Sequence, residues 1–209
     1  MLFRSNLPIV TSPGYEADDV LGTLATQGKA AGYRVKILTG DRDLFQLVSK
    51  DLSGNSISIL YMSTMYGRGF KGGGTEEYGR EQVIAKLGIP PEQVVDYKAL
   101  CGDTSDNIPG VRGIGPKTAV QLLTEYGSLD GLYQALGDLK PALRSKLESQ
   151  REEAYLSQHL SKIVVNVPLS RSLSELQLQG FASGVAMEAF ERLELREFNR
   201  NLEALQLTL

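Results

Sequence analysis

The sequence predicts an α/β fold with a parallel sheet, followed by a mainly helical region. An apolar run at residues 7–10, a helical pattern at 15–31 and a β-branched run at 33–39 follow one another with the spacing of a βαβ unit. Beyond residue 110, glycine and proline punctuate a series of helical patterns, with one further apolar run at 162–167. The 209 residues suffice for one sizeable core with a smaller helical annex.

Turn residues delimit the elements of the α/β half. Pro13 and Gly14 separate the first strand from the helix, and Gly32 is expected to cap the end of that helix. A short helix at 44–48 and a strand at 56–62 follow. Further helices are expected at residues 79–87 and 91–100.

The helical half begins with a glycine-punctuated hairpin. Residues 110–127 read GVRGIGPKTAVQLLTEYG, in which Pro116 is expected to open a helix. Later helices are expected at residues 129–136, 141–160, 185–193 and 195–205, with a strand at 162–167.

The bulk properties are those of a globular protein of the cytoplasm. The net charge is −3, which does not by itself indicate nucleic-acid binding, although clustered acid masks local basic patches. The single Cys101 excludes an internal disulfide framework and fits a reducing compartment. No apolar run approaches the length of a membrane span, and the first residues do not form a signal peptide.

Seven acidic residues fall in three short clusters, each at an expected end of a helix or strand. They are Glu16, Asp18, Asp19, Asp41, Asp43, Asp103 and Asp106. Neighbouring carboxylates raise one another's pKa, and a divalent cation is the usual means of keeping them ionised. Hard oxygen ligands suit Mg²⁺ or Mn²⁺. The clusters therefore predict a magnesium-dependent phosphodiester enzyme.

Each acidic cluster also has a plain structural explanation. Acids in the first turn of a helix are favoured by its dipole, and those after a strand are common turn residues. The pair Asp103 and Asp106 could cap a helix. The joint arrangement, with each cluster at the end of an element, favours the metal site.

The hairpin predicts a nucleic-acid contact. Two glycines let the backbone approach a phosphate, and the free N–H groups of the following helix attract anions. A tight turn between packed helices is the alternative. Lys140, Arg144 and Arg151 recur at helical spacing, which predicts a basic face, although a solvated face is the commoner meaning. The candidate DNA contacts are Arg112, Gly113, Gly115, Lys117, Thr118, Lys140 and Arg144.

Three other features of the sequence say less about function. The segment at 67–74, GRGFKGGG, is expected to be a flexible loop. His159 is interpreted as a surface or half-buried residue, not a catalytic base. Cys101 has no histidine near it in the sequence, so a thiol mechanism is not expected.

Several long motifs resemble one known family. GYEADDVLGTLA, ILTGDRDLFQLVS, DYKALCGDTSDNIPGVRGIGPKTAVQLL and FERLELREF are similar to the 5′-nuclease domain of bacterial DNA polymerase I, within the flap-endonuclease family. The resemblance covers residues 7–205. It implies a parallel, PIN-like core at 1–107 that carries the acids, and a helix-three-turn-helix DNA-binding and carboxy-terminal helical region at 108–209.

The resemblance also implies roles for residues. Two Mg²⁺ or Mn²⁺ ions would be held by the seven acids, Asp103 and Asp106 serving the second ion. It implies catalytic roles for Asp18, Asp41, Asp43, Asp103 and Asp106. Gly113, Gly115 and Lys117 match the DNA clamp, whose backbone carbonyls in this family also hold K⁺.

The family pattern begins earlier than this sequence. It opens with a strand that carries another ligand aspartate and continues through a helical arch, so an amino-terminally truncated core is expected.

The implied function is a structure-specific 5′→3′ exonuclease or flap endonuclease. It would act on nicked or 5′-flap DNA by two-metal hydrolysis in replication and repair, beside a polymerase domain in a longer parent. The alternative is a catalytically impaired DNA-binding fragment. A phosphoryl-transfer receiver fits less well, because Thr-Ser-Pro follows the first expected strand where acids would be needed.

Overall fold

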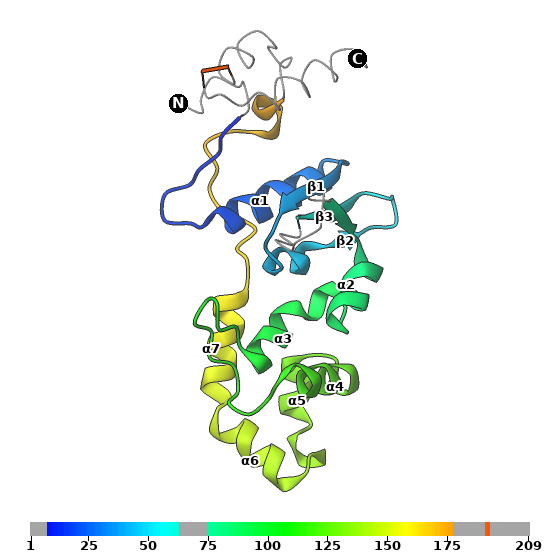
Figure 1. Ribbon diagram of the computed structural model, residues 1–209, viewed down its shortest axis with the longest axis vertical. Coiled ribbons are helices and arrows are strands. Elements are labelled where there is room, and N and C mark those ends of the chain that lie inside the picture. The colour runs from blue at the N-terminus through cyan, green and yellow to red at the C-terminus, as the bar shows by residue number, and fades with distance from the viewer. Residues whose placement is uncertain (1–7, 63–74, 178–190, 193–209) are drawn as a thin grey trace. The chain divides into compact units, whose positions relative to one another are not determined.

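The computed structural model describes residues 8–62, 75–177 and 191–192 (Figure 1). The chain divides into two compact units, Tyr15–Val167 and Met1–Gly14 with Pro168–Leu209. In the smaller unit, the Ser12 hydroxyl donates to the Pro168 carbonyl at 2.9 Å, and a 3₁₀ helix, η5, spans Leu173–Leu176. Within the described residues, no helix has the length and apolar character that crossing a membrane requires.

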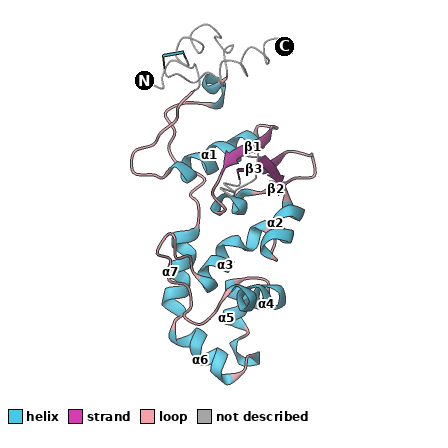
Figure 2. Ribbon diagram, in the orientation of Figure 1, coloured by secondary structure: helices cyan, strands magenta, loops and turns pink. Residues whose placement is uncertain are grey.

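A small mixed sheet lies in the larger unit (Figure 2). Its strands are β1 (Arg34–Thr39), β2 (Ser49–Lys50), β3 (Ser56–Met62) and β4 (Thr75–Tyr78). Strand β3 is central, because it runs parallel to β1 and antiparallel to β2 and β4. In the parallel pair, Arg34 lies opposite Ser56 and Thr39 opposite Tyr61. The parallel pairing expected from the sequence is therefore present, but in a mixed sheet.

The expected first strand is not part of this sheet. Residues 8–10 carry no strand, and Leu7 lies outside the described residues. Four apolar residues do not make a strand without a ladder partner, and the parallel partner of β1 is β3. The chain passes from β1 to β3 through a 3₁₀ helix, η2 (Asp43–Leu47), and the short β2. The α/β fold class was therefore predicted correctly, but the described residues do not form the βαβ unit from which it was predicted.

Helix α1 (Ala17–Ala30) packs against β1 and β3. Its first turn is capped where the Glu16 N–H donates to Asp19 Oδ2 at 3.3 Å. Beyond its end, Gly32 adopts a φ of +90°, as a C-cap glycine does. A Cβ on Gly22 would lie 2.6 Å from Ile163 Cγ2, so a later segment of the chain crosses this helix closely.

That later segment, residues 162–167, is not the expected strand. Side chains satisfy its backbone instead of a ladder. Asp19 Oδ1 accepts from the Val164 N–H at 2.8 Å, and the Thr23 hydroxyl accepts from the Val167 N–H at 3.0 Å. Gln46 Oε1 accepts from the Ile163 N–H at 3.0 Å. The apolar run is buried at Ile163 and Val167 without joining the sheet.

The remaining helices follow the sheet. They are α2 (Arg80–Leu87), η3 (Pro91–Gln93), α3 (Val94–Cys101), α4 (Pro116–Tyr126), α5 (Leu129–Gln134), η4 (Leu136–Asp138), α6 (Pro141–Ser149) and α7 (Arg151–Ser161). Helix α3 is the hub of this region, because it packs against α4, α5 and α7 (Figure 1). Its Ala99 and Leu100 are fully buried.

One long helix expected at 141–160 is two. It breaks at Gln150, whose φ of −123° and ψ of 29° leave the helical region. The side chain of Gln150 is engaged there, since its Oε1 accepts from the Arg112 N–H at 2.7 Å. The loop at 67–74 and nearly all of the two expected carboxy-terminal helices lie outside the described residues.

The core runs without interruption from the sheet into the helices. Beneath the sheet, Phe45 stacks on Tyr78 with ring centroids 4.9 Å apart, and Tyr61 meets both rings. Phe45 and Leu44 of η2 are fully buried, and their packing in the core fixes the position of the turn that follows β1. That turn carries the second acidic cluster.

Candidate metal centre and nucleic-acid interface

The turn after β1 is ordered by its own polar groups. The Thr39 hydroxyl accepts from the Asp41 N–H at 3.0 Å, and Asp41 Oδ1 accepts from the Asp43 N–H at 2.9 Å. Asp43 is the first residue of η2, and the buried Leu44 and Phe45 anchor the residues directly after it. The side chain of Asp43 thereby faces the end of α3.

The loop after α3 depends on two glycines that touch. Gly102 has a φ of +71° and Gly110 a φ of +61°, and a Cβ on Gly110 would lie 2.2 Å from the Gly102 nitrogen. Between them, Asp103 and Ile108 exchange backbone hydrogen bonds of 2.9 and 2.8 Å. The Gly110 N–H donates to the buried Ser157 hydroxyl at 3.0 Å, which ties the loop to α7. No other residue fits either glycine position without moving the backbone.

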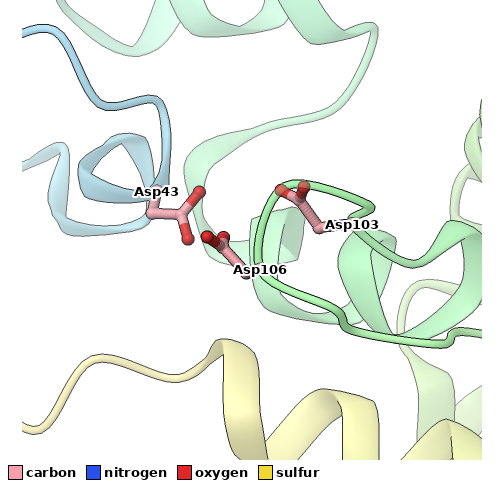
Figure 3. Close-up of side chains that lie close together, drawn as sticks. All are labelled: Asp43, Asp103 and Asp106. Carbon is pink, nitrogen blue, oxygen red and sulfur yellow. The ribbon is translucent and has the colours of Figure 1, made fainter.

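Three of the predicted acids meet at this point. Oxygens of Asp43, Asp103 and Asp106 lie within 4.8 Å of one another. Figure 3 shows the carboxylates of Asp43 and Asp106 pointing toward each other, one from η2 and one from the loop after α3. We call these three residues the carboxylate cluster.

A lysine that the sequence did not indicate lies among them. The Lys98 ammonium contacts Asp43 Oδ1, lies 2.7 Å from Asp103 Oδ2 and 3.7 Å from Asp106 Oδ2. Lys98 belongs to the last turn of α3, where a cation is ordinarily explained by the helix dipole. Its side chain is only 9% exposed, however, so its ammonium interacts with the acids and hardly with solvent. The signal available in the sequence was a lysine five residues ahead of Asp103 on a helix with apolar neighbours.

The pKa values of the cluster reflect burial and this lysine. Burial raises the pKa of Asp43, against the opposing hydrogen bond and charge of Lys98. The hydrogen bond from Lys98, helped by one from Ser105, lowers the pKa of Asp103 to about 2. Burial would lower the pKa of Lys98, but its bonds to Asp103 and Asp43 together raise it. Lys98 therefore favours the charged form of Asp103, whereas burial opposes the charged form of Asp43.

The first acidic cluster lies within electrostatic reach of the second. The pKa of Asp18 is raised by burial and then by the charges of Asp41 and Asp43. Smaller effects of the same sign come from Glu16 and Asp19. Asp19 differs from the others, because both of its oxygens already accept backbone N–H groups. The structure therefore draws Asp18 toward the acids after β1 and uses Asp19 to hold residues 162–167.

The donor set fits a hard divalent cation. Carboxylate oxygens converge from two segments, and the cluster contains no histidine or cysteine ligand. Asp106 is about half exposed, so water could complete the coordination of an ion held there. Burial is the main cause of the raised pKa of Asp18, and the charges of Asp41 and Asp43 raise it further, so a nearby cation would favour its charged form.

A cavity opens beside the carboxylate cluster. It measures about 320 Å³, and Asp43, Lys98 and Asp103 form its polar wall. Tyr97 and Leu87 line its apolar side, and Pro116 at the start of α4 also borders it. The cavity thus lies between the acids and the beginning of the helix that the hairpin introduces.

The hairpin is built by its backbone. Gly113 has a φ of +84°, which favours glycine, and Gly115 is the N-cap of α4 with Pro116 at its first position. The Gly113 carbonyl accepts from the Lys146 ammonium at 3.1 Å. Lys117 in the first turn of α4 is exposed, and Thr118 beside it is half-buried. The free N–H groups of this turn and Lys117 form an anion-attracting surface.

The three basic residues expected on one helical face do not share one. Lys140 is exposed at the N-cap of α6, whereas the Arg144 guanidinium donates to the Gly137 carbonyl at 2.9 Å. Arg151 belongs to α7 and lies over the rings of Tyr133 and Tyr155, at 5.1 and 5.7 Å from their centroids. The expected stripe was wrong because the helix breaks at Gln150.

Comparison with known proteins identifies the two halves of the chain. Residues 1–88 match the 5′-3′ exonuclease, N-terminal resolvase-like domain, and residues 89–183 match the 5′-3′ exonuclease, C-terminal SAM fold. The chain belongs to the 5′-3′ exonuclease family. The carboxylate cluster takes one acid from the first of these matched regions and two from the second.

Curated relatives of this family member are DNA polymerases I. That of Synechocystis is 48% identical over 98% of this chain, and that of Caldicellulosiruptor bescii is 40% identical over 97%. A thermostable DNA polymerase I of Thermus thermophilus is 47% identical over 75%. The chain spans 20%, 23% and 17% of these three proteins, or about a fifth of their length.

Solved structures share the fold at low identity. The T5 5′-exonuclease with bound zinc ions has a TM-score of 0.58 at 22% identity, covering 72% of this chain and 51% of that one. A bacteriophage T5 flap endonuclease in a complex with DNA and metal ions has a TM-score of 0.58 at 19% identity, covering 91% and 60%. The catalytic core of Rad2 with a DNA substrate has a TM-score of 0.53 at 18% identity, covering 91% and 61%. The PIN-like 5′-nuclease fold expected from the sequence is confirmed.

Proposed function

We propose that this chain is the part of a structure-specific 5′→3′ DNA nuclease that holds divalent metal and duplex. The observation that carries the proposal is the convergence of Asp43, Asp103 and Asp106 from two distant segments. Membership of the 5′-3′ exonuclease family supports it. One solved neighbour is described with bound divalent metal ions (zinc), and another with DNA and metal ions.

The proposed metal is Mg²⁺ or Mn²⁺, in two ions. Asp43, Asp103 and Asp106 would hold one ion, and Asp18, Asp41 and Glu16, with Asp19 beside them, would serve the other. Bound ions of this kind lower the pKa of water and stabilise the leaving oxygen in phosphodiester hydrolysis. The chain's own contribution is to fix these carboxylates through the turn after β1 and the glycine-crossed loop after α3.

The DNA would be gripped by the hairpin and the first turn of α4. Support comes from the backbone N–H groups after Gly115 and the exposed Lys117 beside them. Arg112, Gly113 and Thr118 belong to the same surface, and Lys140 remains a separate candidate. Arg144 is a weaker one, because its guanidinium donates to backbone carbonyls. In this proposal residues 1–107 carry the chemistry and residues 108–209 carry the duplex.

Three further assignments belong to the same proposal. A potassium ion at the hairpin would use backbone carbonyls such as that of Gly113, which already accepts from a cation, Lys146. A polymerase domain is the proposed partner in a longer parent, because the curated relatives are DNA polymerases I. A cytoplasmic location is proposed from the single Cys101.

The test uses a 5′-labelled flap duplex with Mg²⁺. Cleavage by the wild-type chain should fall at least about a hundredfold in Asp43→Asn and in Asp103→Asn, because each removes an ion ligand. An Asp51→Asn variant, in an exposed turn of the sheet, serves as the matched control and should cleave as the wild type does. Equal cleavage by all four proteins would show that the activity lies elsewhere.

A non-catalytic DNA-binding function is the second candidate. The observation that favours it is Lys98, which already neutralises part of the carboxylate cluster. This candidate predicts duplex binding that needs Lys117 and no metal-dependent product from any variant. Product formation that depends on Asp103 would eliminate it.

A further inference from the structure

Lys98 lies where a cation bound by the carboxylate cluster would lie. Its ammonium is within 4.0 Å of all three acids, at 2.7 Å from Asp103 and 3.7 Å from Asp106, and in direct contact with Asp43. In the part of the chain that the structure describes, no other lysine or arginine forms an ion pair with these residues. One tethered positive charge therefore faces three negative charges.

The charge of Lys98 does not balance the charges of the three carboxylates. A single ammonium leaves a net excess of negative charge in a partly buried site, and a divalent ion would compensate more of it. The ammonium and the ion need the same carboxylates, so close approach by one excludes the other. Binding of the ion must include the cost of displacing a buried, hydrogen-bonded lysine.

The structure provides space for the displaced side chain. The cavity of about 320 Å³ beside the cluster is lined by Lys98 itself. Arg42 and Thr104 border the same space, and Tyr97 and Leu87 offer an apolar wall for the aliphatic part of the lysine. A rotation of the Lys98 side chain could move the ammonium away from the acids while α3 stays in place.

We propose that the Lys98 ammonium competes with a divalent cation for the carboxylate cluster. Before the ion binds, Lys98 holds Asp43, Asp103 and Asp106 together, and when the ion binds, the Lys98 side chain moves aside. The proposal rests on the proposed metal-dependent function. It makes Lys98 a positioning residue that lowers the affinity of the cluster for metal and stabilises the metal-free chain. Such a site is kept assembled in the absence of metal at the expense of tight binding.

The test measures Mn²⁺ binding by the loss of the free-ion electron paramagnetic resonance signal, with melting temperatures in EDTA. Lys98→Met keeps the length of the side chain and removes its charge. It should bind Mn²⁺ about tenfold more tightly than the wild type, because a competing unit charge has been removed. It should also melt at a lower temperature in EDTA and gain more from added Mn²⁺, because its carboxylates then lack a counter-ion.

Two control variants separate the possible failures. Lys29→Met removes another half-buried lysine, which donates to the Ser49 hydroxyl at 3.0 Å, and should leave Mn²⁺ binding unchanged. Asp103→Asn should lose the site. If the wild type and Asp103→Asn bind Mn²⁺ alike, the metal site and the inference both fail. If Asp103→Asn loses binding but Lys98→Met binds no more tightly than the wild type, only the inference is overturned.

The design also covers a variant that does not fold in EDTA. Lys98→Met and the more polar Lys98→Gln are then refolded with and without Mn²⁺ and compared by circular dichroism. Recovery of the fold with Mn²⁺ alone supports the inference, because the ion replaces the missing ammonium. Equal failure with and without Mn²⁺ in both variants overturns it.

Discussion

The carboxylate cluster and the hairpin are built in opposite ways. The cluster consists of side chains that come from η2 and from the loop after α3, and its geometry exists only once the larger unit has folded. The hairpin consists of backbone groups at Gly113 and Gly115 that are consecutive in sequence. A site made from distant side chains depends on packing elsewhere, whereas a site made from local backbone depends on its own glycines.

The crossing of Gly102 and Gly110 holds the loop that carries Asp103 and Asp106, so a side chain added there should disturb the carboxylate cluster. Gly110→Ala places a Cβ about 2.2 Å from the Gly102 nitrogen at a φ of +61°. We expect a loss of about 3 kcal/mol or more of unfolding free energy, measured by urea denaturation, because backbone has to move. Gly137→Ala, at a glycine with open space around it, should change stability little. Similar losses in the two variants would refute the close crossing.

The hairpin is expected to act on DNA without affecting the metal. Lys117→Glu should weaken duplex binding by about tenfold or more and flatten its salt dependence, because a phosphate contact is replaced by repulsion. Fluorescence anisotropy at several salt concentrations measures both effects. Lys50→Glu, at an exposed lysine of the sheet, is the matched control. A loss of Mn²⁺ binding in Lys117→Glu would break the separation between the two regions.

The ion pair between Lys98 and Asp103 should make the stability of the metal-free chain depend on pH in the acid range. Lys98 and Ser105 lower the pKa of Asp103 from 3.8 to about 2, so its stabilising contribution is complete above 3.8 and is lost as the pH falls through about 2. Melting temperatures in EDTA should therefore separate wild type from Asp103→Asn at neutral pH and converge at the acid end. A difference that stays constant with pH would contradict the ion pair.

The two basic residues of the α6 region should differ from each other. Arg144→Met should cost about 1 kcal/mol of stability, because its guanidinium bonds to two carbonyls, and should change DNA affinity little. Lys140→Met at the exposed N-cap should change stability little and weaken DNA binding, with a salt slope smaller by about 1. Equal effects on DNA affinity would restore the single basic face that the sequence suggested.

The same contrast explains what the sequence could predict. The ends of β1, α3 and α4 were marked by local signals, so the acids at Asp41 and Asp103 and the hairpin glycines were placed at the correct element ends. Lys98 was missed because a lysine in the last turn of a helix has an ordinary explanation, and only the folded loop brings Asp103 back to it. Long-range geometry of this kind leaves no periodic signal.

The errors also have physical causes. The run at 162–167 has the composition of a strand, but Asp19, Thr23 and Gln46 supply its hydrogen bonds, which no strand propensity records. The continuous helix expected at 141–160 ends where Gln150 turns to bind the hairpin backbone at Arg112. In both cases a tertiary side-chain bond decided the local structure.

The central claim is that Asp43 and Asp103, far apart in the sequence, hold one divalent ion. A double-mutant cycle for Mn²⁺ affinity over Asp43→Asn, Asp103→Asn and the double variant tests it most directly. If the two carboxylates share an ion, the double variant should bind little worse than the weaker single variant. Fully additive losses, or single variants that bind as the wild type does, would contradict the shared site.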